Sequence, residues 1–155
     1  FNIYRGLDGG SYESGSGSTG SGSSSSNNLD IEEFREEVIR LTNIERENAG
    51  LEPVTADDTA MEYAQIRAEE LAISYSHTRP NNEDKSSNGL YFNENIAYGQ
   101  KTPAEVVQDW MNSPGHCATL LGNYSEYGNK FGVGVYKSGG KIYWSQEFVG
   151  WDANA

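Results

Sequence analysis

The stretch FGVGVYKSGGKIYWSQEF, residues 131–148, predicts a β-hairpin that decides the fold class. Apolar and polar residues alternate on both sides of Gly139-Gly140, as in two strands that each bury one face. A Gly-Gly pair accepts the positive φ angles of a two-residue turn. The chain is therefore expected to end in an antiparallel hairpin. Its inward side chains are predicted to be Phe131, Val133, Val135, Ile142, Trp144, Gln146 and Phe148.

Four helical patterns precede this hairpin. Asp30 is an N-cap followed three residues later by a glutamate, and apolar residues then recur at helical intervals until Gly50. A second helix is expected from about Thr55, with small residues along its inner stripe. A third and a fourth are predicted after Thr102 and Ser113, each a cap residue followed by proline. Helices first and a hairpin last predict an α+β fold with helices packed on a sheet.

The segment between the second and third helices has no clear period. Asn, Ser, Pro and Gly dominate residues 76–93, which are therefore predicted to form a loop. Residues 94–98 predict a short strand or an ordered turn.

The first 28 residues differ in composition from the rest of the chain. Thirteen of the sixteen residues from Ser11 to Ser26 are Ser or Gly, which predicts a flexible linker. We therefore expect residues 1–28 to be a linker or tail and residues 29–155 to be the single folded domain. If this tail is ordered, a groove on its own domain or on a neighbouring one is expected to hold it.

Charge and composition exclude several classes of function. The 155 residues carry a net charge of −12, which would repel a nucleic-acid backbone. No apolar run is long enough to span a membrane. Cys117 is the single cysteine, so no intrachain disulfide or multi-cysteine metal cluster can form.

His77 and His116 are the two histidines and the first candidates for chemistry. His116 is expected at the third position of the fourth helix, where the helix dipole keeps its imidazole neutral. Ser113 is expected to cap that helix by accepting the backbone N–H of His116. Cys117 is interpreted as a small apolar side chain, with a reactive thiol as the alternative. The separation of the two histidines matches no zinc motif.

A series of motifs resembles bacterial members of the CAP superfamily of cysteine-rich secretory, antigen 5 and pathogenesis-related 1 proteins, also called SCP domains. The motifs occur in the family's order and cover most of residues 31–149. They are RLTNIER at 40–46, AGLEP at 49–53, AQIRA at 64–68, SHTRP at 76–80, ENIA at 94–97, WMNSPGH at 110–116, FGVGV at 131–135 and YWSQEF at 143–148.

The resemblance implies an α-β-α sandwich with a three- or four-stranded antiparallel sheet between helices. It also implies a cleft with two histidines, here His77 and His116, and a first acid, Glu94. Ser113 occupies the place of the second acid of many eukaryotic members. Two other residues depart from the family pattern, Asn93 where a glycine precedes the acid and Cys117 where an arginine is usual.

Three functions are compatible with this site. The first is zinc binding by His77 and His116, with Glu94 as a third ligand or as a partner that orients one imidazole. The second is hydrolysis by Ser113, His116 and Glu94, although no nucleophile elbow or oxyanion hole is present in the sequence. The third, which we favour, is a binding module without turnover. It would be secreted or attached to the cell surface and would hold a peptide, a cell-wall fragment, or a sterol or other lipid.

Overall fold

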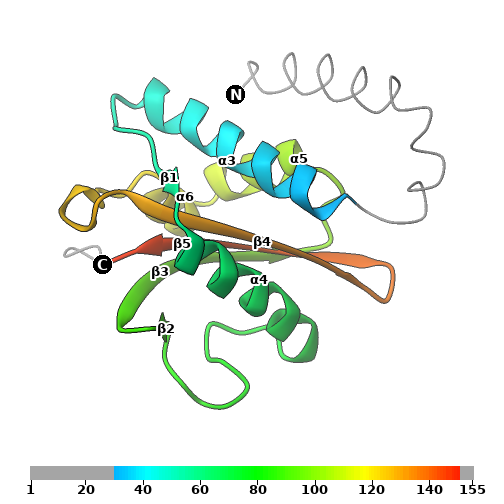
Figure 1. Cartoon of the computed structure of the whole chain (residues 1–155). Coiled ribbons are helices and arrows are strands. Elements are labelled where there is room, and N and C mark those ends of the chain that lie inside the picture. Colours follow the sequence, from blue (N-terminus) through cyan, green and yellow to red (C-terminus); the bar gives the residue numbers. More distant parts are fainter. Residues whose placement is uncertain (1–29, 151–155) are drawn as a thin grey trace.

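In the computed structural model, residues 30–150 are described, and they form helices on both faces of one sheet (Figure 1). The five strands are β1 (Thr55–Ala56), β2 (Ser86–Ser87), β3 (Leu90–Tyr98), β4 (Lys130–Ser138) and β5 (Lys141–Val149), in the order β1-β4-β5-β3-β2. From the sequence, residues 1–28 are predicted to be a linker or a tail held in a groove. These residues lie outside the described part of the chain.

The antiparallel core of the sheet is β4-β5-β3. The predicted hairpin is confirmed, with Val135 opposite Trp144 on the neighbouring strand. β3 runs antiparallel to β5 on its other side, where Glu94 is opposite Glu147. Two residues of β1 add to β4 in parallel, and two residues of β2 add to β3. The predicted sandwich is therefore confirmed, with a short strand added at each edge.

Helix α3 (Ile31–Asn48) begins as predicted, because the Asp30 carboxylate accepts the backbone N–H of Glu33. Helix α4 (Asp58–Ile73) begins later than expected, since residues 55–56 pair with β4 and Asp57 takes the N-cap. Helices α5 (Pro103–Met111) and α6 (Pro114–Leu120) both begin at the predicted prolines. A 3-10 turn, Ser125–Tyr127, leads into β4.

The predicted loop at residues 76–93 is wrong in its last part. β2 and the first four residues of β3 lie within it, and the Phe92 N–H donates to the Lys85 carbonyl. β2 pairs with the start of β3 across a short turn, and residues 92–93 of β3 pair with β5, so strand pairing rather than an alternating pattern holds these residues in the sheet.

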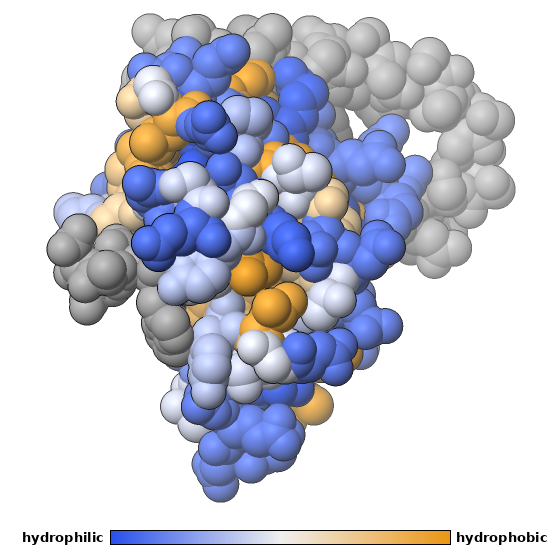
Figure 2. Space-filling view, turned by 60° about the vertical axis from the view of Figure 1, so that its left-hand side comes forward, coloured by the Kyte–Doolittle hydropathy of each residue, from blue (hydrophilic) through white to orange (hydrophobic). Residues whose placement is uncertain are grey.

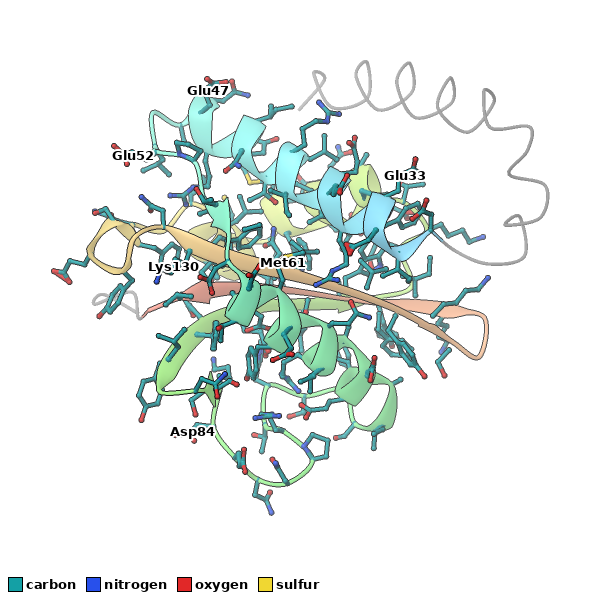
Figure 3. All side chains as sticks on the ribbon, viewed as in Figure 1. Glu33, Glu47, Glu52, Met61, Asp84 and Lys130 are labelled. Atoms are coloured by element: carbon teal, nitrogen blue, oxygen red, sulfur yellow. The ribbon has the colours of Figure 1, made fainter. Side chains whose placement is uncertain are left out.

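The two layers of helices are unequal. Helices α3, α5 and α6 cover one face, and α4 alone covers the other (Figure 1). Trp144 is buried as predicted, and Trp110 is buried with it in the larger core on the α3 side. Met61 lies between α4 and the sheet, and its sulfur accepts the Val133 N–H at 3.4 Å (Figure 3).

Helix α4 packs unusually close to the hairpin. A Cβ built on Gly132 would lie 2.0 Å from the Ala60 carbonyl oxygen, and one on Gly134 would lie 2.0 Å from that of Ala64. The Ser145 hydroxyl donates to the same Ala64 oxygen at 2.7 Å. The small inner stripe predicted for this helix therefore serves close packing on the sheet.

The outer surface is mainly hydrophilic. Polar side chains cover most of the face in Figure 2, with small hydrophobic patches between them. Within residues 30–150, none of the helices combines the length and the apolar character that a membrane span requires.

Candidate functional site

An open cleft of about 310 Å³ lies where β3, α6 and the segments around His77 and Lys85 meet. All four residues predicted for the site, His77, Glu94, Ser113 and His116, line this cleft although they come from separate parts of the chain. The other lining residues are Lys85, Asn93, Asn95, Gly115 and Thr119.

His77 follows α4 and is held by Glu94 of β3. Its Nδ1 lies 2.9 Å from Glu94 Oε1, and half of the histidine side chain is exposed. Because Glu94 carries a carboxylate, Nδ1 is the donor and Nε2 is the nitrogen left for a ligand. The pair therefore fixes both the tautomer and the orientation of the ring.

Arg67 in turn fixes Glu94. The Arg67 side chain is completely buried. The guanidinium donates to both Glu94 oxygens, at 2.7 and 3.1 Å, to Glu70 at 2.8 Å, and to the Ser76 carbonyl at 2.6 Å. Burial alone would raise the pKa of Glu94, but its interactions with His77, Glu147 and Arg67 outweigh burial and lower the pKa to about 2. Glu94 is therefore ionised at neutral pH, although it is buried.

Glu147 lies beside Glu94 on β5 and is completely buried. Neither of its carboxyl oxygens has a hydrogen-bond partner among the described residues, and the same holds for the Tyr63 hydroxyl. Burial, and after it the charge of Glu94, raises the pKa of Glu147 well above its usual range. The two carboxyl groups therefore differ: the pKa of Glu94 is lowered and Glu94 is ionised, whereas the pKa of Glu147 is raised.

His116 lies at the start of α6 and contacts Ser113. Its Nδ1 is 3.0 Å from the Ser113 hydroxyl. The predicted capping bond is wrong, because Ser113 makes no side-chain bond to the helix N-terminus and its oxygen contacts the imidazole instead. Burial, and after it the nearby His77, lowers the pKa of His116. The expected neutral imidazole is thus supported, but burial and a second imidazole cause it.

The site consists of two separate pairs. Glu94 contacts His77, and Ser113 contacts His116, so Glu94 does not orient the histidine that touches the serine. Within residues 30–150, no three His, Cys, Asp or Glu side chains are grouped to hold a metal ion. What the cleft offers a ligand is two imidazoles, each fixed through Nδ1.

A second hollow of about 230 Å³ adjoins the cleft and shares Ser113 and His116 with it. Tyr75 and Tyr98 line it, both about half exposed, with ring centroids 4.7 Å apart. The cleft therefore continues past His116 toward an aromatic surface.

Three charged residues of this region were missed by the sequence analysis: Arg67, Lys85 and Glu147. The available signal was the sandwich itself. Helices on both faces bury both sides of the central strand β5, so the polar side chain of Glu147, alternating with the predicted apolar set, had to be buried too. Arg67 lies on the face of α4 that covers it.

Cys117 is half-buried, with its sulfur 4.0 Å from that of Met111. Burial, and after it the charge of Glu45, raises the pKa of the Cys117 thiol. This direction supports the interpretation as a small apolar side chain and opposes a reactive thiolate.

Comparison with known families gives one extended match. The model described as the cysteine-rich secretory protein family, CAP, matches residues 39–148, which include all four predicted site residues. The uncharacterized protein YkwD of Bacillus subtilis (strain 168) is 35% identical over an alignment of 127 residues that covers 76% of this chain and 47% of the relative. The chain thus spans about half the length of this relative.

Solved structures share the fold. An outer surface protein from Borrelia burgdorferi superposes with a TM-score of 0.68 at 21% identity, over 78% of this chain and 95% of the other. An extracellular protein containing an SCP domain from Bacillus anthracis gives 0.64 at 26% identity, over 77% of this chain and 41% of the other. A cysteine-rich secretory protein from Staphylococcus aureus gives 0.56 at 18% identity, over 79% and 40%.

Proposed function

The chain belongs to the cysteine-rich secretory protein family, and from this premise we propose that its domain is an extracellular binding module acting through the cleft around His77, Glu94 and His116. The described locations of the relatives support the extracellular part of this proposal, since they are named as outer surface, extracellular or secretory proteins.

One observation carries the binding role. Two imidazoles distant in sequence line one open cleft, and each is fixed through Nδ1, His77 by Glu94 and His116 by Ser113. Because each ring is already held in one orientation, less conformational entropy is lost when a ligand binds. Both Nε2 atoms are then the ring nitrogens available to a ligand.

A divalent cation, with zinc as the best match, is part of this proposal. Neutral imidazole nitrogen is a preferred zinc ligand, and a carboxylate behind the ring is the usual orienting partner. The residues fit such an ion as an open site with two protein ligands, because the Glu94 oxygens already accept bonds from Arg67 and His77. When bound, the ion would supply a Lewis acid for an oxygen or nitrogen of the ligand.

The organic ligand is proposed from the lining of the cleft. Asn93, Asn95, Ser113 and Thr119 add amides and hydroxyls to the two imidazoles. This polar set favours a peptide or a cell-wall fragment over a sterol or another lipid, because buried polar groups need hydrogen-bond partners. A segment of the chain's own residues 1–28 is one such peptide.

Zinc titration by calorimetry tests the proposal. Wild type is expected to bind one ion, and His77→Ala and His116→Ala are expected to abolish measurable binding. Glu94→Gln is expected to weaken binding by about 10–100-fold, since it removes the partner that orients His77. Glu69→Gln, an exposed change on α4, is the matched control and should bind as wild type does. Identical traces for wild type and His77→Ala would refute the zinc site.

A weak hydrolase is the second candidate, and the contact of 3.0 Å between the Ser113 hydroxyl and His116 Nδ1 favours it. In that reaction His116 would accept the serine proton as the hydroxyl attacks an ester or peptide carbonyl. Glu94 would act at a distance, because it contacts His77 instead. Steady ester or peptide turnover that is lost in both Ser113→Ala and His116→Ala would establish this activity, and its absence in wild type would refute it.

A further inference from the structure

The carboxylates nearest the cleft are already neutralised. Arg67 binds both oxygens of Glu94 and one of Glu70. Arg79 binds both oxygens of Glu70, at 3.1 and 2.9 Å. Arg79 also binds the exposed Glu83 at 3.2 Å, so two guanidinium groups are shared among Glu94, Glu70 and Glu83. The only carboxylate that lines the described cleft, Glu94, contributes no uncompensated charge to it.

Lys85 is the cation that this network leaves out. Its half-buried side chain lines the cleft, and its ammonium forms no ion pair or hydrogen bond with residues 30–150. Its positive charge acts to lower the pKa of Glu147, which is completely buried behind Glu94.

The remaining lining residues cannot supply the missing negative charge. Asn93, Asn95, Ser113 and Thr119 are neutral, and an imidazole is either neutral or positive. Lys85 is thus the only lysine or arginine among the described residues that line the cleft, in a chain whose net charge is −12. An ammonium without an ion-pair partner in such a recess favours an anionic group, which the acidic remainder of the surface repels.

We propose that Lys85 is a ligand-binding residue and that the cleft takes the free carboxylate of a peptide. This inference rests on the proposed binding function and names the chemistry of its ligand. One ammonium matches a monoanion, whereas a phosphate dianion would need further cationic donors that the described lining does not provide.

The size of the site agrees with a short peptide. The cleft of about 310 Å³ exceeds what a carboxylate alone would fill, and the adjoining hollow of about 230 Å³ shares Ser113 and His116 with it. The carboxylate binds at the Lys85 end, and the preceding residues extend past His116 toward Tyr75 and Tyr98.

Two probes that differ only in charge test this inference. N-acetyl-glycyl-glycine and its C-terminal amide are titrated into protein freed of metal with a chelator, and binding is followed by NMR shifts of the cleft residues. The acid is expected to bind at least about tenfold more tightly than the amide in wild type. Lys85→Gln should remove this preference. Lys137→Gln, an exposed change on β4 outside the cleft, should keep it.

The outcomes separate this inference from the proposed function. Equal binding of acid and amide by wild type would overturn the carboxylate preference, with no variant needed. An acid preference that survives in Lys85→Gln would overturn the role of Lys85. If neither peptide binds while zinc still binds through His77 and His116, the peptide inference fails and the metal-binding cleft stands. Inorganic phosphate binding more tightly than the acid would also overturn the inference.

Discussion

Replacing Glu147 by glutamine should change how the stability of the protein depends on pH. Glu147 is completely buried, both its oxygens lack hydrogen-bond partners among the described residues, and its neighbour Glu94 is ionised. Burial and the charge of Glu94 raise the pKa of Glu147 in the folded state. In the unfolded chain the same carboxyl titrates near about 4.3.

The sign of the effect follows from proton counting. Below the unfolded pKa both states hold the proton, and the contribution of Glu147 to stability is fully present. Above it the unfolded state loses the proton and the folded state keeps it, so stability falls by up to about 1.4 kcal/mol per pH unit until the folded pKa is reached. The loss therefore accumulates with rising pH from the unfolded pKa up to the raised folded pKa. Glu147→Gln cannot titrate and should not show it.

Urea unfolding of wild type and Glu147→Gln at several pH values measures this difference. The free energy of unfolding of the variant should rise relative to wild type as pH increases, by up to about 1.4 kcal/mol per pH unit. A constant cost of burying the amide shifts the variant's curve without changing this slope. Glu69→Gln, exposed on α4, is the control and should run parallel to wild type. Parallel curves for Glu147→Gln and wild type would show that Glu147 is ionised in the folded protein.

Three further predictions concern the same buried layer. Glu94→Gln should lower the free energy of unfolding at pH 7 by up to about 3 kcal/mol, measured in urea, because the buried Arg67 loses one of its two carboxylate partners and keeps only Glu70. As pH falls from about 4.5 toward about 2, the free energy of unfolding of wild type should lose the contribution of the Glu94 carboxylate. Glu94→Gln should show no such loss. Gly134→Ala should destabilise by about 1–3 kcal/mol or more through its clash with the Ala64 carbonyl, whereas Gly115→Ala, where a Cβ meets open space, should not. No change in midpoint for Gly134→Ala would contradict the close packing of α4.

Elements with local signals could be predicted from the sequence. The Asp30 cap, the prolines at the starts of α5 and α6, and the Gly139-Gly140 turn each act within a few residues, and all appear in the structure. The two-residue strands β1 and β2 could not be predicted in this way. β1 exists because it pairs with β4, which is distant in sequence. β2 exists because it pairs with the start of β3, which lacks a regular pattern.

The residues of the site could be predicted from the sequence, but the contacts between them could not. The family motifs identified His77, Glu94, Ser113 and His116, and the fold brings all four to one cleft. Sequence could not show that Glu94 contacts His77 and not His116, because that choice depends on where α4 and β3 place the two side chains. The cap signal at Ser113 was misleading, since a local rule lost to a contact with the imidazole.

A crystal grown with zinc, compared with one grown without it, tests the central claim most directly. The account predicts an anomalous density peak within bonding distance of the imidazoles of both His77 and His116, with Glu94 still bound to Arg67 behind the first ring. A map without a peak between the two rings, or with zinc only on surface carboxylates, would contradict the claim that these imidazoles form one binding site.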